Sequence, residues 1–520
     1  MYAETLHWID YIVIILSLVV SLYVGFYFVK KQTSTNAYFA GSRSIPSWAV
    51  GMSILATLIS SITFLAYPGE GFKSNWILLV QAIMVVIVLS GLVWFVVPLF
   101  RKVIGISTYE YFEKRFGFFA RIYTSLAFTF THFTKMGTVF FLMGLALSSM
   151  TGMDTLSVIW VIGIVVIVLT MMGGIEAVIW LDVIQGFMLI GGGLIALALI
   201  LFIPEGGPGA VIANAIENNK IGFGPYDFDF AKLTFFVMVL NGIFYGIQKY
   251  GTDQTIVQRY LTAKSEKGAI KAALMGVLLS LPVWALFMFI GTALFSFYQV
   301  TDFTLPEGLK ADQVFPYFIT TQVPPGLTGL ILSALIAAAI SSLDSDLNCL
   351  SAVGVTDYYT RLKPDATDQQ KLKVGRWIVF FSGLAALIIA TVYVYAGGEG
   401  VLGIVFELYA IFSGGIAGIF ILGLFSRRAN KHGLYIAIVI CVIFTSYAVL
   451  TSTKVDGEPI LNLGPMNFPH HKYMLGVYTH FIIIIVGYLA SLFYKSDVPH
   501  EELTIYWWIK NRKAIGKADL

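Results

Sequence analysis

The chain carries the stretch Ile340-Ser341-Ser342-Leu343-Asp344-Ser345-Asp346-Leu347-Asn348, on which the interpretation of the whole sequence depends. It places two carboxylates, three hydroxyl groups and one amide inside a strongly apolar part of the chain. Ionisable groups are costly at membrane depth, so those found there usually mark the path of an ion or a substrate. If the neighbouring segments are membrane helices, this stretch indicates a carrier.

Four polar side chains of the stretch share one helix face. Ser341, Asp344, Ser345 and Asn348 follow the spacing i, i+3, i+4 and i+7, which brings them to the same side of an α-helix. Their oxygen atoms are hard ligands and suit Na⁺ as they suit other hard cations. The alternative is that the acids pair with Lys or Arg in structural ion pairs.

The composition is that of a membrane protein along the whole length. Of the 520 residues, 58% are hydrophobic and 12% are charged, whereas a soluble domain has about 25% charged residues. The net charge of +3 gives no indication of nucleic-acid binding. Cys349 and Cys441 both lie in apolar runs, without the spacing of a disulfide framework or a metal site. The sequence has no His-Glu-x-x-His or Gly-x-Ser-x-Gly motif, so we do not expect an enzyme.

Thirteen segments are apolar and long enough to span a bilayer, which takes about 20 residues. They cover residues 8–29, 46–68, 76–100, 117–150, 154–172, 177–203, 233–258, 266–299, 326–358, 373–396, 400–425, 432–451 and 473–494. We therefore expect an all-α integral membrane protein with about 13 transmembrane helices. The loops near 204–230, 300–325 and 452–472 are the long external ones and are expected to form short capping helices.

Lys and Arg are distributed unequally between the two sides of these spans. Of the 33 Lys and Arg residues, 25 fall on the side that includes the C-terminus, and cytoplasmic loops are the ones enriched in Lys and Arg. The distribution therefore predicts a multi-pass protein with the N-terminus outside and the C-terminus cytoplasmic. The sequence has no Asn-x-Ser/Thr sequon, which favours a prokaryotic cell (inner) membrane. The first span is followed by Lys30-Lys31 and is expected to be retained rather than cleaved as a signal peptide.

The segment 46–68 has a small and polar centre, with Ser53, Thr57, Ser60, Ser61 and Thr63. Carbonyl groups freed at a helix break can coordinate a cation, and hydroxyl groups can line a cavity. Alternatively, these hydroxyl groups bond back to the preceding helical turn.

Two lysines fall inside predicted spans. Lys135 lies in the middle of the segment 117–150, and could bind a solute carboxylate or hydroxyl or neutralise a buried Asp. Lys249 has the same alternatives but could also extend its amine to the interface. His132 is interpreted as a packing residue.

Further polar residues lie near the ends of other spans. Spacing favours an interfacial position for Asp182, although it could complete an ion site with the stretch 340–348. For Asp253 a helix cap or a gate salt bridge is favoured over ion binding. Gln81 and Glu407 are additional polar candidates.

At these motifs the chain resembles the sodium/solute symporter family, which includes the sodium/glucose cotransporters and bacterial sialic acid and proline carriers. The resemblance covers nearly the whole chain, about residues 8–450. The motifs that carry it are Ala56 to Thr63, Gly173 to Gly186, Gln254 to Arg259, Ala337 to Ser342 with Asn348, and Leu422 to Phe425.

The resemblance implies a LeuT-like core of two inverted five-helix repeats, in which the first helix of each repeat is broken. These broken helices are the segments 46–68 and 233–258. The domain boundaries that follow are a peripheral first helix (1–45), the first repeat (46–203), an external loop (204–232), the second repeat (233–425), and peripheral helices with a cytoplasmic tail (426–520).

The resemblance also implies binding sites. The principal Na⁺ site of the family matches Ala56, Ile59, Ala338, Ser341 and Ser342. A second cation site, present in some members, matches Asp182, Ser341, Asp344 and Ser345. The positions implied or proposed to contact the solute are Ser60, Thr63, Gln81, Lys135 and Lys249.

This sequence departs from the family pattern at several of these positions. Position 344 is usually a hydroxyl or small residue, and a second carboxylate near Asp182 would raise cation affinity or take up a proton. Asp346 is also unusual. The polar sugar contacts of the bacterial galactose carrier are replaced by Gly246, Gly276 and Phe406. Two lysines in one cavity suggest an anionic solute.

The expected function is that of a sodium-coupled secondary active symporter. It would import a small polar organic solute, a sugar or an organic acid such as sialic acid or a monocarboxylate, by alternating access, with Na⁺ as the co-transported ion. The alternative is a cation channel or solute sensor that shares the fold without coupled uptake.

Overall fold

The computed structural model describes residues 6–29, 34–395, 414–455, 458–495 and 501–518, with side chains up to residue 511. The first half of the chain contains α1 (Trp8–Val29), α2 (Thr35–Ala40), α3 (Ser47–Leu58), α4 (Ser61–Lys73), α5 (Ile77–Val103), α6 (Tyr109–Phe116), α7 (Phe118–Thr151), α8 (Thr155–Phe202) and α9 (Gly207–Glu217). The middle contains α10 (Phe235–Gly251), α11 (Gln254–Thr262), α12 (Glu266–Val300), α13 (Ala311–Gln322), α14 (Leu327–Val353), a π-helical turn (Gly354–Tyr359), α15 (Thr360–Leu362) and α16 (Asp368–Tyr395). The last part contains α18 (Ile416–Phe425), α19 (Lys431–Ser452), the antiparallel pair β1 (Lys454–Val455) and β2 (Glu458–Pro459), α20 (Lys472–Ser491) and α21 (Ile505–Ala518).

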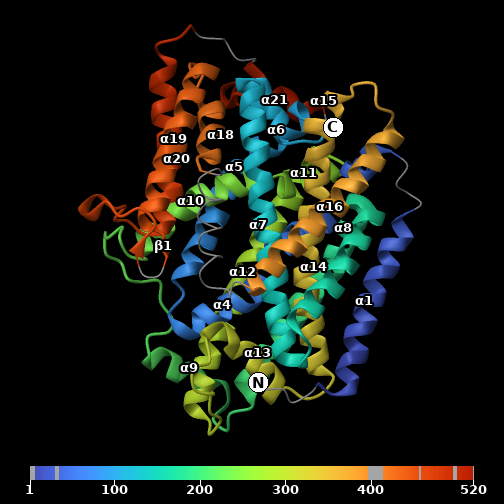
Figure 1. The fold of residues 1–520 in the computed structure, drawn as a ribbon, viewed down its shortest axis with the longest axis vertical. Coiled ribbons are helices and arrows are strands. Elements are labelled where there is room, and N and C mark those ends of the chain that lie inside the picture. Colours follow the sequence, from blue (N-terminus) through green and yellow to red (C-terminus); the bar gives the residue numbers. More distant parts are fainter. Residues whose placement is uncertain (1–5, 30–33, 396–413, 456–457, 496–500, 519–520) are drawn as a thin grey trace.

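The molecule is a helical bundle with α14 near its centre (Figure 1). Every residue of α14 from 331 to 353 is buried, and the helix packs against α8, α7, α1, α16 and α3. The carboxylate of Asp10 on α1 accepts the N–H groups of Gly326 and Gly329, at 2.6 and 2.7 Å. It thereby satisfies donors at the N-terminus of α14, which have no partner within the helix.

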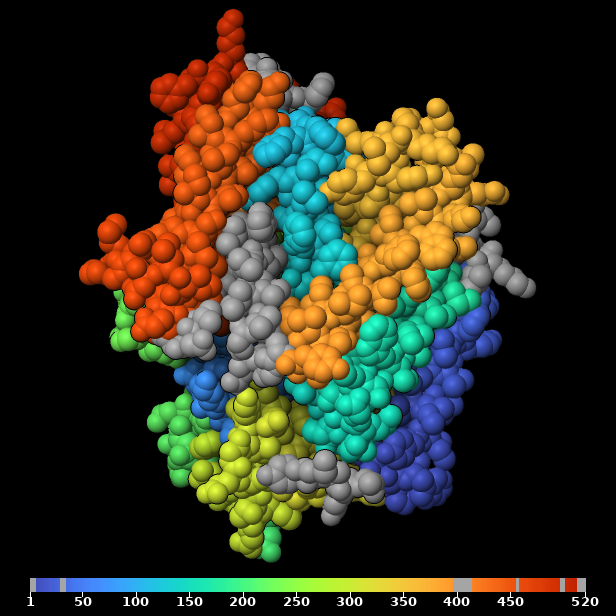
Figure 2. Space-filling view, in the orientation of Figure 1, coloured from blue at the N-terminus to red at the C-terminus, as the bar shows by residue number. Residues whose placement is uncertain are grey.

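The outer helices present apolar side chains outward. On α1 these include Ile15, Leu16 and Phe26, which are all more than half exposed. Figure 2 shows α1 along one edge of the molecule and α19 with α20 along the opposite edge. Large exposed apolar surfaces mark sites of interaction with a protein or a membrane, and nine of the described helices are long and apolar enough to cross a membrane.

Both helices that were predicted to be broken are broken. The segment 46–68 forms α3 and α4, whose axes are bent by 57°. The segment 233–258 forms α10 and α11, separated by Thr252 and Asp253. The predicted boundary between 154–172 and 177–203 lies within α8, where Gly174 adopts φ 58° and ψ −170°.

The exact number of spans is not fixed by the described residues. Nine of their helices are long and apolar enough to cross a membrane, and the bent pair α3–α4 adds a tenth. The predicted span 400–425 falls largely on residues 396–413, which lie outside the described part of the chain, as do Phe406 and Glu407. The count of thirteen therefore stays a prediction, whereas α9 and α13 confirm helices in two of the three external loops.

One end of the bundle is held by buried and half-buried charges. Arg121 at the start of α7 pairs with Asp357 in the π-helical turn after α14, and with Glu113 of α6 at 2.6 Å. Burial alone would raise the pKa of Glu113, but hydrogen bonds from Arg121 and Arg361 hold it below its usual value. These contacts tie α6 and α7 to the end of α14.

Candidate functional site

The site is organised by the break between α3 and α4. The N–H of Ile59 donates to Leu55 at 3.1 Å and is the last helical hydrogen bond of α3. Ser60 is extended, and its hydroxyl accepts the N–H of Ile62 at 3.2 Å, which starts α4. The carbonyl groups in the last turn of α3, including that of Ala56, thus face a break instead of a further helical turn.

The stretch 340–348 lies directly against this break. The hydroxyl groups of Thr57 on α3 and Ser345 on α14 are 3.2 Å apart. Asp182 on α8 bridges the same two helices, because it accepts the hydroxyl groups of Ser53 and Ser341, each at 2.5 Å. Two segments almost 300 residues apart are therefore in contact, as the implied Na⁺ site requires.

The five residues matched to the principal Na⁺ site are all buried, and they belong to the two segments that meet at the break. They are Ala56, Ile59, Ala338, Ser341 and Ser342. The Ser342 hydroxyl has no hydrogen-bond partner among the described residues. A buried hydroxyl without a partner is costly, and a cation between the two segments would remove that cost.

Asp182 is fully buried within the protein and is hydrogen-bonded to α14, so it contributes to the group around the stretch 340–348. Its charge is met by Arg259 of α11, whose Nη2 lies 2.9 Å from the Asp182 carboxylate and 2.7 Å from the Ser345 hydroxyl. The Nε of Arg259 also donates to Ser53 at 2.7 Å. A guanidinium thus stands among the residues matched to the second cation site.

Asp344, the fourth member of that set, points elsewhere. One of its carboxylate oxygens accepts the hydroxyl of Thr170 on α8, and the other has no hydrogen-bond partner among the described residues. The structure therefore brings Asp182, Ser341 and Ser345 into one hydrogen-bonded group, with Asp344 bonded to α8 beside it.

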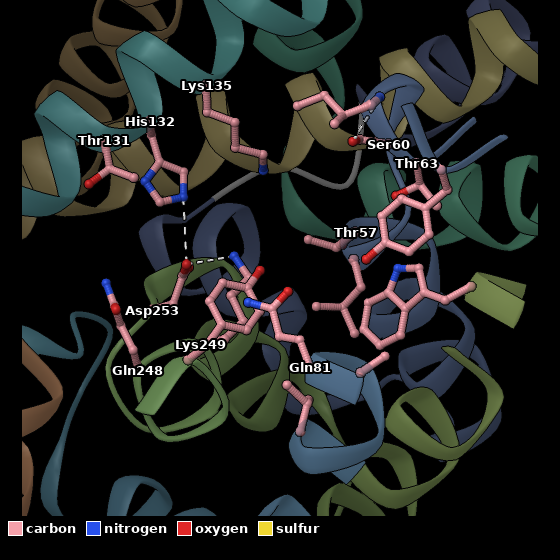
Figure 3. Close-up of a pocket in the computed structure, with 17 residues that line it drawn as sticks. Thr57, Ser60, Thr63, Gln81, Thr131, His132, Lys135, Gln248, Lys249 and Asp253 are labelled. Atoms are coloured by element: carbon pink, nitrogen blue, oxygen red, sulfur yellow. Dashed lines mark hydrogen bonds and ion pairs between the residues drawn. The ribbon is translucent and has the colours of Figure 1, made fainter. Parts of the chain in front are cut away.

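A cavity of about 310 Å³ lies beside the helix break (Figure 3). All five residues assigned to solute contact line it, namely Ser60, Thr63, Gln81, Lys135 and Lys249. The other polar groups of its wall are Thr57, Thr131, His132, Gln248 and Asp253, and aromatic residues such as Tyr67 and Trp284 complete it. Gln81 is itself hydrogen-bonded to Asn241 at 2.7 Å.

Both lysines of the cavity wall are paired with carboxylates. The Nζ of Lys135 lies 3.0 Å from each carboxylate oxygen of Asp346, which is fully buried behind it. The Nζ of Lys249 lies 2.6 Å from Asp253. Of the alternatives for Lys135, the structure thus shows the neutralisation of a buried Asp.

His132 lies near the carboxylate of each pair, and Figure 3 shows its contact with Asp253. Its Nε2 is 3.7 Å from Asp253 and 3.6 Å from Asp346, and its Nδ1 lies 2.9 Å from the Phe128 carbonyl. Asp253 also accepts the N–H of Thr255 and caps α11, which confirms the predicted cap. Its ion pair with Lys249 is present, and a gating role for that pair stays a prediction.

A family model described as the sodium:solute symporter family matches residues 38–441. The chain belongs to this family. It is 31% identical over 504 residues to the sodium/sialic acid symporter NanT of Aliivibrio fischeri, with 97% of each chain covered. It is 34% identical to the sodium/sialic acid symporter SiaT of Proteus mirabilis, over 84% of this chain and 88% of that relative.

The fold agrees with solved transporters. A substrate-bound, outward-open Na⁺-coupled sialic acid symporter superposes with a TM-score of 0.86 at 31% identity, covering 94% of this chain and 99% of that one. The transporter Mhp1 shares the fold at 16% identity, with a TM-score of 0.59. The chain is therefore a multi-pass, sodium-coupled symporter of a small polar organic solute with a LeuT-like fold, and it is not an enzyme.

Proposed function

We propose that this symporter holds Na⁺ between the end of α3 and the middle of α14, and that the solute binds in the adjoining cavity. The ligands would be the carbonyl oxygens of Ala56, Ile59 and Ala338 and the hydroxyl groups of Ser341 and Ser342. Unwound carbonyls and the C-terminal ends of half-helices coordinate Na⁺ in transporters of this architecture. The observation that carries the proposal is the unpartnered Ser342 hydroxyl, buried beside the break.

The residues that follow the same break would contact the solute. Helix α4 begins at Ser61, and Ser60, its N-cap, and Thr63 in its first turn both line the cavity. The N-terminus of a helix carries partial positive charge. Na⁺ on one side of the break would fix the position of these groups, so ion binding would favour the solute-competent state. Ordinary linkage of this kind amounts to about 1–3 kcal/mol.

A second cation site at Asp182, Ser341, Asp344 and Ser345 remains part of the proposal. Arg259 already supplies a positive charge to two of these residues. A second ion would therefore have to share Asp182 with the guanidinium or displace it.

We also propose that the protein resides in the cell (inner) membrane with its N-terminus outside, and that residues 46–203 and 233–425 form the two inverted repeats. In support, the N-terminal end of α1 lies at the same end of the bundle as α9 and α13, and α6, α15 and α21 lie at the other end (Figure 1). The end with α6, α15 and α21 carries the loops that are rich in Lys and Arg.

Uptake into proteoliposomes tests the coupling. An inward Na⁺ gradient should drive accumulation of radiolabelled solute, and a K⁺ gradient of the same size should not. Ohmic Na⁺ current without saturable solute uptake would instead indicate a channel.

The Ser342→Ala variant tests the principal Na⁺ site. A hydrogen-bond-type contact to a charged group contributes about 1.5–3 kcal/mol, so the Na⁺ concentration for half-maximal uptake should rise at least about tenfold. The matched control is Ser333→Ala on the same helix, because the buried Ser333 hydroxyl bonds its own helix at Gly329. An unchanged Na⁺ dependence in Ser342→Ala would remove this residue from the site.

A further inference from the structure

The charges around the cavity cancel. Lys135 and Lys249 contribute two positive charges to its wall, and each lysine is already within 3.0 Å of a carboxylate, Asp346 for the first and Asp253 for the second. The formal charge of these four groups is zero. The presence of two lysines alone suggests an anionic solute, but these pairings remove the basis for that suggestion.

Separating Lys135 from Asp346, or adding a second carboxylate beside them, is electrostatically unfavourable. Asp346 is fully buried on α14, whereas the Lys135 side chain is 23% exposed and reaches the cavity wall. A solute carboxylate bound to Lys135 would lie beside Asp346, so that two negative charges would share one ammonium. Turning Lys135 away from Asp346 would instead leave a buried charge uncompensated, which is strongly unfavourable.

A neutral hydroxyl does not have this effect. The Lys135 ammonium carries three donors and can donate to a hydroxyl oxygen of the solute while the ion pair stays closed. The remaining polar lining consists of hydroxyl groups, such as those of Thr57, Ser60 and Thr63, and the amides of Gln81 and Gln248. Such groups both donate and accept, as a sugar or polyol requires.

We infer that Asp346 is a specificity-determining residue, which by neutralising Lys135 makes the cavity select an uncharged polyhydroxylated solute, a sugar or polyol, over a carboxylate. This inference rests on the proposed position of the solute beside α4. It predicts a different preference from the transport of sialic acid, a carboxylate, for which the two relatives described above are named.

Pairs of solutes that differ in one carboxylate provide the test. The pairs are glucose with glucuronate, galactose with galacturonate, and the methyl ester of N-acetylneuraminate with N-acetylneuraminate itself. Uptake of each radiolabelled compound into proteoliposomes under an inward Na⁺ gradient gives kcat/KM. We expect the neutral member of at least one pair to be favoured by at least about tenfold, the ratio that corresponds to 1.4 kcal/mol.

The Asp346→Asn variant should abolish this preference. With Lys135 released, the ratio of acid to neutral uptake should rise at least about tenfold, whereas Asp346→Glu, which keeps the charge, should retain the wild-type ratio. The double variant Lys135→Gln/Asp346→Asn has no buried unpaired charge and covers the case in which Asp346→Asn does not fold. It should still favour the neutral member.

In the wild-type protein, a preference for the acids, or no uptake of any neutral compound, would overturn the inference. In Asp346→Asn, an unchanged acid-to-neutral ratio would do so. In the double variant, a preference for the acids would do so. Failure of the proposed function is a separate outcome. In that case the compounds would enter without Na⁺ dependence, or Na⁺ alone would not raise the melting temperature of the wild-type protein.

Discussion

Asp344 is a buried carboxylate whose only hydrogen bond among the described residues comes from the hydroxyl of Thr170. An amide oxygen can accept that hydroxyl equally well, so Asp344→Asn should fold with little change in melting temperature. If Asp344 ligates a second cation, uptake by this variant should depend less steeply on Na⁺, with the Hill coefficient falling from about two towards one. The same steepness in both proteins would leave Asp344 outside the ion path.

The residue types of the site were predictable from the sequence, but their partners were not. Ser60, Thr63 and Lys135 were assigned to solute contact through the family resemblance, and all three line the cavity. For Lys135 there was a second reason, because an ionisable group inside an apolar segment has to face protein or water. Arg259 was named only as the end of a family motif and as one of the charges on one side of the membrane. Its pairing with Asp182 depends on how α11 packs against α8, which no local spacing determines.

At the scale of the element, glycine sets the bend in α8. Gly174 has φ 58° and ψ −170°, a conformation that is essentially restricted to glycine and costs other residues about 1–3 kcal/mol. Gly174→Ala should therefore lower the melting temperature of the detergent-solubilised protein. Gly191→Ala on the same helix is the matched control, because its added methyl group would meet no atom within 4 Å and alanine favours a helix. Equal losses in both variants would argue against a strained turn at Gly174.

Both broken helices were expected from the family resemblance, and the segment 46–68 also because its centre is small and polar. The breaks lie at Ile59-Ser60 and at Thr252-Asp253. The direction and size of each bend follow from packing, and the 57° between α3 and α4 could not be read from the sequence.

At the scale of the whole molecule, the distribution of Lys and Arg makes the orientation testable. Both natural cysteines, Cys349 and Cys441, are buried, so introduced thiols can be labelled selectively. Ala213→Cys on the exposed side of α9 should react with a membrane-impermeant maleimide in intact cells. Leu362→Cys, at a position 85% exposed near the opposite end, should react only after the cells are opened.

The reverse labelling pattern would invert the proposed orientation. Reaction of both positions in intact cells would place the two loops on one side and contradict the alternating topology. The protein without an introduced cysteine is the control. If it stays unlabelled, the two natural cysteines need not be replaced.

The paired charges beside the cavity have a consequence for the energy source of transport. A carboxylate carried with one Na⁺ would make each cycle electrically silent, whereas a neutral sugar leaves every co-transported ion uncompensated. The resting potential would then perform work on each turnover, about 2.3 kcal/mol per 100 mV for a single charge. For one ion per cycle this amounts to about a fiftyfold accumulation ratio even at equal Na⁺ concentrations, since 1.4 kcal/mol corresponds to a factor of ten. At one Na⁺ per cycle, the ion pair formed by Asp346 would thus decide whether the cell's voltage contributes to nutrient uptake.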